Sequence, residues 1–343
     1  MVSLTIDERK VTVEEGTTIL QAAAAVGIKI PTLCYHKRLN PIGACRMCLV
    51  EVEGYANPMT ACTTPAEEGI KVCTTSERLQ KMRKDNLKLL LVNHPLECPI
   101  CDAGGKCELQ DIVYQFGIET ADYYAERPAK STEYSTPLIR HWPHRCIMCL
   151  RCVHACRNVT LGVLDVVGTG IAAQISPVHK ERCTSCGECL RSCPTGALTE
   201  NLSRHRGRPW NTERIKTTCT YCGCGCQLEL MVANKKIISV TASEEGTNQG
   251  SLCVKGRFGY EFIQSAERLS KPLIKKDGEF READWDEALS LVAERLGAIK
   301  SSHGADSIAG LASARCTNEE NFLFQKFIRA VIGTNNIDHC ARL

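Results

Sequence analysis

The sequence predicts an α+β protein built from several small domains rather than from one large fold. Three observations support this class. Cysteine is abundant, with 23 residues in 343, and most of it lies in short runs. Alternating apolar and polar residues near the N-terminus predict short strands, and a long amphipathic segment near the C-terminus predicts a helix. The length of 343 residues by itself favours two or three domains.

Composition excludes several classes of protein. The formal net charge is only +3 and no basic stripe interleaves with aromatic residues, so we expect no nucleic-acid partner. No stretch approaches 18 consecutive apolar residues, so we expect no membrane span. The N-terminus carries no export signal, which predicts a cytoplasmic location. That location, the odd cysteine count and the tight clustering argue against a disulfide scaffold and favour metal-binding thiols.

The first domain is predicted over residues 1–78. The segments "VSLTI" and "VTV", separated by a turn at residues 7–10, predict a β-hairpin. Thr18 and Gln21 form a capping-box pattern ahead of "ILQAAAAVG", which predicts a short helix ending near Gly27. A hairpin, a helix and a cysteine-bearing loop together favour a β-grasp domain.

The rest of the chain divides by composition and periodicity into five segments. They are a helical domain around a Cys/His loop (79–118), a polar linker (119–138), a domain with a twice-occurring cysteine pattern (139–205), a further cysteine unit with two strands (212–267) and the start of an α/β domain (268–343). In the last segment we expect a long helix over 280–304, a strand over 307–313 and an amphipathic helix within 313–333. Its second strand is expected to lie beyond the sequence.

The first cysteine set has the spacing C-x10-C-x2-C-x13-C. Its members are Cys34, Cys45, Cys48 and Cys62. Two irons bridged by two sulfides need four thiolates, and Gly43 and Ala44 would let the backbone approach the sulfides. The spacing is a variant of the plant-type [2Fe–2S] pattern with a longer first gap. A structural zinc site is the alternative, although zinc prefers closely spaced pairs.

The second set lies in "HPLECPICDAGGKC" and combines one imidazole with three thiols. Its members are His94, Cys98, Cys101 and Cys107. Pro95 fixes the approach of His94, and an imidazole in place of a thiolate leaves a [4Fe–4S] cluster less negative, which raises its potential. Zinc held by three cysteines and one histidine is the alternative.

Two further runs share the spacing C-x2-C-x2-C-x3-C, which is typical of two-cluster [4Fe–4S] ferredoxins. In such proteins the fourth cysteine of each run binds the other cluster. We therefore predict two exchanged sets: Cys146, Cys149, Cys152 and Cys193, and Cys183, Cys186, Cys189 and Cys156. Cys156 precedes Arg157 rather than proline, a small departure from the pattern.

A fifth set has the spacing C-x2-C-x3-C-x26-C, with the predicted strands "LELMVA" and "KIISVTA" before its last member. We assign Cys219, Cys222, Cys226 and Cys253 to a fourth [4Fe–4S] cluster, with a zinc ribbon as the alternative. Four cysteines remain, and we expect them to be small buried apolar residues, although Cys224 could compete as a ligand: Cys73, Cys224, Cys316 and Cys340.

These motifs resemble known families. Residues 1–200 are similar to the N-terminal module shared by the large iron–sulfur subunit of NADH dehydrogenase (complex I) and the iron-only hydrogenases. "CTYCGCGC" and "GSLCVKGRFGYEFI" resemble the opening of the molybdopterin oxidoreductases. The last 31 residues resemble the α subunits of cytosolic, NAD(P)-linked formate dehydrogenases.

The resemblance implies reversible oxidation of formate to CO2 at a molybdenum or tungsten centre held by two pyranopterin guanine dinucleotides. Electrons would pass through the Cys219 cluster, the paired clusters, the His94 cluster and the [2Fe–2S] cluster, and Lys255 would assist transfer between pterin and cluster. The sequence shows no dinucleotide-binding fingerprint. We therefore expect an electron partner: a flavin- and NAD(P)-binding iron–sulfur subunit, a hydrogenase or a ferredoxin.

In this family, "CARL" or its equivalent is followed by a metal-binding selenocysteine or cysteine. We therefore expect that the sequence is either an open reading frame closed at an in-frame UGA codon or its real truncated product, and that the 343 residues alone lack formate dehydrogenase activity. Two other classes stay open: a stand-alone electron-transfer protein without enzymatic activity, and a hydrogenase-type or complex I-type electron-input subunit.

Overall fold

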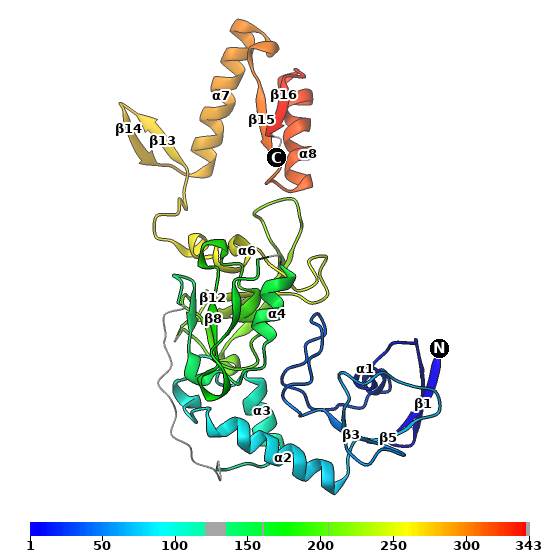
Figure 1. Cartoon of the computed structure of the whole chain (residues 1–343). Coiled ribbons are helices and arrows are strands. Elements are labelled where there is room, and N and C mark those ends of the chain that lie inside the picture. Colours follow the sequence, from blue (N-terminus) through cyan, green and yellow to red (C-terminus); the bar gives the residue numbers. More distant parts are fainter. Residues whose placement is uncertain (121–134, 160, 205, 341–343) are drawn as a thin grey trace. The chain divides into compact units, whose positions relative to one another are not determined.

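The computed structural model describes residues 1–120, 135–159, 161–204 and 206–340 (Figure 1). They form two compact units, residues 1–213 with 231–234 and residues 214–230 with 235–343. Most of the predicted linker 119–138 lies outside the described residues. Within the described part, no helix is both long and apolar enough to span a membrane.

The first unit begins with a mixed five-stranded sheet in the order β2-β1-β5-β3-β4. Its strands are β1 (Val2–Ile6), β2 (Arg9–Val13), β3 (Leu49–Val52), β4 (Met59–Thr60) and β5 (Lys71–Cys73). β1 and β2 form the predicted hairpin, and Asp7 and Glu8 in its turn adopt the positive φ angles that such two-residue turns require. β1 also pairs with β5 in parallel.

Helix α1 (Ile19–Ala25) packs on this sheet and buries Ile19, Leu20, Ala22 and Ala23 in a common core. The predicted capping box is confirmed, because the Thr18 side chain accepts from the backbone of Gln21 and the Gln21 side chain accepts from the backbone of Thr18. A mixed sheet with one helix across it agrees with the β-grasp arrangement expected from the sequence.

Two helices follow, α2 (Glu77–Val92) and α3 (Glu108–Gln115), with the 3-10 turn η1 (Cys98–Ile100) between them. Ser76 caps α2 by accepting from the Leu79 amide at 3.2 Å. The helical character expected around the Cys/His loop is therefore confirmed.

The internal repeat predicted from the paired cysteine runs is visible as a repeated local structure. A 3-10 turn precedes the first cysteine of each run, and a short helix follows its second cysteine: η2 (Pro143–Arg145) with α4 (Arg151–Asn158), and η4 (Lys180–Arg182) with α5 (Glu188–Ser192). The strands β6 (Ile139–His141) and β9 (Leu198–Glu200), at the two ends of the repeat, pair with each other. Between the two runs, β7 (Leu164–Val167) and β8 (Gln174–Pro177) form a hairpin that contains η3 (Gly170–Ala172). A further turn, η5 (Pro209–Asn211), follows.

The next elements form a three-stranded sheet and a short helix. They are β10 (Glu213–Thr218), β11 (Gln227–Ala233), β12 (Lys236–Ala242), α6 (Val254–Phe258) and η6 (Glu261–Gln264). β11 and β12 contain the two strands expected between the ligands of the fifth set. Tyr260 anchors the segment after α6 to β12, since its hydroxyl donates to the Ile238 carbonyl at 2.7 Å.

The C-terminal elements confirm part of the sequence prediction and correct two points. They are β13 (Leu273–Lys276), β14 (Glu279–Glu282), α7 (Trp285–His303), η7 (Ala305–Ser307), β15 (Gly310–Ser313), α8 (Asn318–Lys326), the π-helical turn η8 (Phe327–Ile332) and β16 (Ile337–Cys340). The long helix begins at Trp285 rather than at residue 280, because residues 279–282 pair with β13 and Asp284 caps the helix.

The expectation that the second strand of the α/β unit lies beyond the sequence is wrong. β15 and β16 pair in parallel, with Gly310 opposite Ile337, and α8 connects them (Figure 1). Ile308, Ile328 and Ile332 form the buried core of this βαβ unit. The missed signal is the short run "NIDHC", whose single apolar residue gives no alternating pattern to detect.

Candidate metal centres

The first cysteine set is brought together as two thiol pairs. The four thiols are almost fully buried, between 0 and 8% exposed. The Cys34 and Cys45 side chains are hydrogen-bonded to each other, and so are those of Cys48 and Cys62. Two pairs of thiolates are the donor set of two irons, because each iron of a [2Fe–2S] cluster takes two protein ligands. The residues therefore fit this cluster.

Backbone amides point at the same sulfurs. The Cys34 amide lies 3.4 Å from Cys45 Sγ, and the Cys45 amide lies 3.4 Å from Cys34 Sγ. The Gly43 and Ala44 amides donate to Cys62 and Cys34. Gly43 has a φ of 64°, which explains why a glycine stands there. The backbone at Gly43 and Ala44 thus approaches the cysteine sulfurs, and its approach to the sulfides of a cluster stays a prediction.

The same contacts set the acidity of the thiols in this set. The hydrogen bond with Cys45, together with burial, raises the pKa of Cys34. That hydrogen bond lowers the pKa of Cys45 to about 6. Cys48 and Cys62 repeat this asymmetry, with the pKa of Cys48 raised and that of Cys62 lowered by their mutual hydrogen bond. Metal binding requires thiolates, so a cluster bound here would release the protons that these thiols carry.

The second set lines a single narrow cavity, to which His94, Cys98, Cys101 and Cys107 all contribute. His94 Nδ1 lies 3.1 Å from the Arg145 carbonyl oxygen. A carbonyl can only accept, so Nδ1 carries the proton and Nε2 is the acceptor nitrogen. A backbone partner on one ring nitrogen is the usual way in which a protein orients a metal-binding histidine. The imidazole is therefore in the tautomer that binds iron through Nε2.

A segment from the neighbouring domain closes this cavity. The Pro194 carbonyl accepts from Cys107 Sγ at 3.6 Å. Gly196 faces Cys101, and a methyl group built on it would overlap Cys101 Sγ. Arg208 covers the other side by donating to the carbonyls of Cys101 and Pro99, both at 2.6 Å.

The paired runs form two cavities with the exchanged membership that the motif predicts. One is lined by Cys146, Cys149, Cys152 and Cys193, and the other by Cys183, Cys186, Cys189 and Cys156. Each cavity thus takes three thiols from one run and the fourth from the other. Leu150 and Gly187, which precede the two helices, have positive φ angles of 60° and 77° and turn the chain around each cavity.

Burial dominates the acidity of these thiols. It raises the pKa of Cys149, Cys152 and Cys189 well above the ordinary thiol value, and neighbouring cysteines add to the effect. Three or four thiolates side by side in an apolar site are unstable without a cation to balance them. The chemistry of the donor set therefore fits a bound cationic cluster core.

The spacing of the donors also bears on the zinc alternatives. A single zinc ion would gather four sulfurs within roughly 3.8 Å of one another, given Zn–S bonds of about 2.3 Å. In the described part of the chain, no group of three or more Cys, His, Asp or Glu side chains is gathered closely enough to hold one metal ion. A cubane spreads its ligands over four separate irons and so does not require four sulfurs to converge on one ion.

The fifth set assembles in the second unit. The Cys219 amide donates to the Cys226 carbonyl at 2.8 Å, and α6 starts directly after Cys253. A methyl group built on Gly256 in this helix would lie 3.7 Å from Cys219 Sγ, so the helix packs against the first ligand. Lys255 lies on the exposed side of the helix. Burial raises the pKa of Cys226, and the neighbouring thiol of Cys224 adds to this shift.

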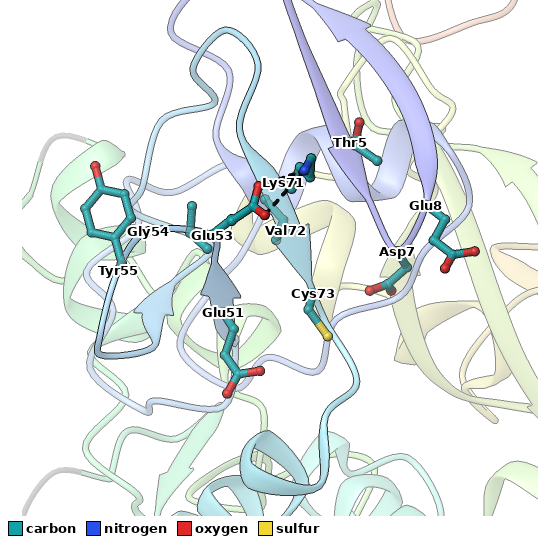
Figure 2. A pocket seen from close by; sticks show the side chains of 11 residues that line it. Thr5, Asp7, Glu8, Glu51, Glu53, Gly54, Tyr55, Lys71, Val72 and Cys73 are labelled. Carbon is teal, nitrogen blue, oxygen red and sulfur yellow. Dashed lines mark hydrogen bonds and ion pairs between the residues drawn. The ribbon is translucent and has the colours of Figure 1, made fainter.

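The expectation that the remaining cysteines are buried apolar residues is wrong. Cys73, Cys224, Cys316 and Cys340 are all exposed, whereas most of the assigned ligands are buried or half-buried. None of the 23 cysteines, all within the described residues, forms a disulfide. Cys73 borders an open groove that also contains Asp7, Glu51 and Glu53 (Figure 2). The groove holds no predicted ligand, and Lys71 is paired with Glu53 in it at 3.0 Å.

Sequence reasoning missed two buried arginines beside the ligands and the carboxylates that pair with them. Arg145 Nε lies 2.6 Å from Glu97 Oε1. The Arg151 guanidinium donates to both carboxylate oxygens of Glu108, at 2.7 and 2.8 Å. Although burial works to raise the pKa of Glu97, Arg145 and His144 hold it below its ordinary value. Glu97, Glu108, Arg145 and Arg151 are each adjacent in sequence to a ligand cysteine, which is the signal that could have singled them out.

The chain matches five known families in succession. By their descriptions they are "2Fe-2S iron-sulfur cluster binding domain" (residues 1–77), "NADH-ubiquinone oxidoreductase-G iron-sulfur binding region" (83–122), "4Fe-4S dicluster domain" (145–198), "Molybdopterin oxidoreductase Fe4S4 domain" (212–265) and "Molybdopterin oxidoreductase" (268–343).

Three relatives match this chain over 99% or more of its length. The chain is 46% identical to the "NADPH-Fe(3+) oxidoreductase subunit alpha" of Geobacter sulfurreducens and 40% identical to an NADH-quinone oxidoreductase subunit of Rhizobium meliloti, over its whole length in both cases. It is 32% identical, over 99% of its length, to a Staphylococcus aureus protein named "Putative formate dehydrogenase". The matched segments of this chain are therefore iron–sulfur cluster-binding domains followed by two molybdopterin oxidoreductase segments.

The chain spans about 40% of the length of those three relatives. Among solved structures it resembles a chain of an NAD+-reducing [NiFe]-hydrogenase, with a TM-score of 0.57 and 30% identity. That match covers 60% of this chain and 90% of the hydrogenase chain. The sequence predicted a resemblance to the iron-only hydrogenases, whereas this solved structure is a hydrogenase of the [NiFe] class.

Proposed function

We propose that these 343 residues form the electron-relay part of a formate dehydrogenase-type subunit, holding one [2Fe–2S] and four [4Fe–4S] clusters in the sets assigned above. When bound, the clusters would supply a series of one-electron carriers. The observation that carries this proposal is that three of the sites in the first unit share one apolar core. A purely structural role would not require redox sites to be neighbours.

That shared core contains ligands from three sets. Cys34 and Cys45 of the first set, Cys101 and Cys107 of the second, and Cys149 of the third are buried in it. Leu33 and Met47 from the first domain pack there with Leu87 and Leu91 of α2. Burial in a common apolar region keeps water away from the carriers, and burial is one of the factors that set cluster potentials.

The second and third sets are joined more closely still, by two short stretches of backbone. The Arg145 carbonyl accepts from His94 Nδ1 and from the Thr195 hydroxyl at 3.0 Å, and the next residue is Cys146. The other stretch is 193–196, which begins at a ligand of the third set and ends against Cys101 of the second. Each stretch of backbone therefore contacts both the second and the third ligand set, so that only a few covalent and hydrogen bonds separate the two sites.

The remaining components are proposed for the whole protein rather than for this chain. A molybdenum or tungsten bis-pyranopterin would be the site of formate oxidation, with Lys255 near the electron exit. A flavin- and NAD(P)-binding iron–sulfur subunit, a hydrogenase or a ferredoxin would be the electron partner. The assignment of formate rests on the 32% identity to the Staphylococcus aureus relative. A cytoplasmic location stays a prediction.

The proposal is tested with the protein purified anaerobically from its host. Formate is added, and the reduction of each cluster is followed by EPR in the wild type and in Cys101→Ser. In the wild type we expect every cluster signal to appear. In the variant the paired clusters should still be reduced, while the [2Fe–2S] cluster stays oxidised. Cys73→Ser, an exposed cysteine outside the five sets, is the matched control and should behave like the wild type.

A second candidate is the oxidation of NADPH, favoured by the 46% identity to the Geobacter sulfurreducens subunit. The same samples distinguish the two. If NADPH reduces the clusters and formate does not, the proposed function becomes oxidation of NADPH instead of oxidation of formate. If neither donor reduces any cluster while dithionite reduces all of them, the chain is a stand-alone electron carrier and both enzymatic proposals fail.

A further inference from the structure

One buried cation in the first unit interrupts an otherwise apolar stripe. Helix α2 buries residues 79, 83, 87 and 91, which recur every four residues and face the same side. Three of them are leucines, but the fourth is Arg83, and it is only 2% exposed. A charged residue at a core position costs stability unless it serves another purpose.

The contacts of Arg83 show that its charge is not neutralised locally. Its Nη2 donates to the Leu49 carbonyl at 2.6 Å, and among the described residues its Nε has no hydrogen-bond partner. Other buried arginines near ligands face carboxylates, as Arg145 does with Glu97 and Arg151 with Glu108. For Arg83 no ion pair with a carboxylate is found within the part of the chain that the structure describes.

The position of Arg83 places that charge beside the first ligand set. Leu49 directly follows Cys48, whose thiol is 1% exposed. Burial lowers the pKa of the guanidinium, and the Cys48, Asp7 and Cys73 side chains oppose this shift in that order. Even so, an arginine remains charged in proteins. The strongest opposing partner is thus a cluster ligand rather than a carboxylate.

The carboxylates of the adjacent groove do not cancel this charge. Asp7, Glu51 and Glu53 line the open groove of Figure 2, where they meet solvent. The carboxylate of Asp7 is occupied by the Thr74 amide at 2.7 Å and by the Thr74 hydroxyl. Water screens charges at an open surface far more than charges in a core. Arg83 therefore dominates the local field on the inner side.

We propose that Arg83 tunes the [2Fe–2S] cluster by stabilising its reduced form and so raises its reduction potential. Adding one electron to a cluster with four thiolate ligands increases its negative charge, and a fixed buried cation favours that state. The cluster would then be a better electron acceptor than its ligand set alone would make it. This inference rests on the proposed [2Fe–2S] site and adds a potential-setting residue outside the ligand loop.

The test is an EPR-monitored redox titration of the [2Fe–2S] cluster in the anaerobically purified protein. Arg83→Gln removes the charge and keeps an N–H donor for Leu49, whereas Arg83→Lys keeps the charge. Arg78→Gln is the control, because Arg78 lies on the same helix but is exposed and pairs with Glu51 at 3.8 Å. We expect Arg83→Gln to lower the reduction equilibrium constant about tenfold or more, which is a shift of about 59 mV for one electron. Arg83→Lys and the control should shift much less.

An unchanged potential in Arg83→Gln with full iron content would overturn the inference. If Arg83→Gln fails to hold the cluster, Arg83→Lys decides: a wild-type potential supports a charge effect, and a lowered potential refutes it. Loss of the cluster in both variants assigns Arg83 a structural role and also refutes it. Absence of a [2Fe–2S] signal in the wild type would instead refute the proposed cluster assignment itself.

Discussion

Replacing Gly196 by alanine should remove one cluster from the protein. A methyl group at this position would overlap Cys101 Sγ, because the two atoms would be closer than the 3.0 Å below which Cβ atoms in proteins are essentially never found. The methyl group would also lie 3.3 Å from Ala103 Cβ. Ordinary contact begins at 3.4 Å, so the sulfur must move by more than about 0.4 Å, whereas metal–ligand distances tolerate only about 0.2 Å. The added methyl also costs about 1–3 kcal/mol of folding stability through overpacking.

The assay is the iron and sulfide content per chain after anaerobic purification, together with EPR of the dithionite-reduced protein. We expect Gly196→Ala to lose the iron of one [4Fe–4S] cluster and the signal of the His94 site, and to keep the other signals. Gly297→Ala is the control, because a methyl group there has nothing within 4 Å. Full iron content in Gly196→Ala would refute the proposed role of Cys101 as a ligand.

Three further predictions concern other parts of the chain. His94→Cys should lower the potential of its cluster, because a thiolate adds negative charge where an imidazole stood; a raised potential in the EPR titration would contradict this. Tyr260→Phe should lower the free energy of unfolding, measured by thermal unfolding, by about 0.5–1.5 kcal/mol, because it removes the 2.7 Å hydrogen bond to Ile238. Tyr55→Phe, at an exposed tyrosine, should leave the free energy of unfolding unchanged, and equal effects of the two variants would contradict the prediction. Iodoacetamide should alkylate only the four cysteines outside the five sets until a chelator removes the iron, as mass spectrometry would show.

Local signals in the sequence predicted local structure well. The Thr18 and Gln21 capping box and the strands on either side of the turn at Asn234 depend on neighbouring residues, and both are present. The exchange of Cys156 and Cys193 between the paired sets could also be foreseen, because three cysteines at that pitch reach only three corners of a cubane.

Contacts between distant residues could not be predicted in this way. Gly196 faces Cys101 across 95 positions of sequence, and nothing local marks it as a glycine that must stay small. The exposure of Cys73 and Cys316 was missed because the general burial preference of cysteine says nothing about a particular strand end or loop. Arg83 stands in a leucine stripe that becomes meaningful only when the helix is placed against β3.

The shared apolar core of the first unit has a consequence for how the protein is made. Leu33, Met47, Leu87 and the ligand cysteines packed with them come from three different domains. The proposed clusters would hold these thiols together, and metal binding of this kind is coupled to folding. Cluster insertion and the packing of the three domains would therefore be one maturation event. A cell that fails to deliver iron–sulfur clusters would accumulate a chain with an open core, which is a ready substrate for proteolysis.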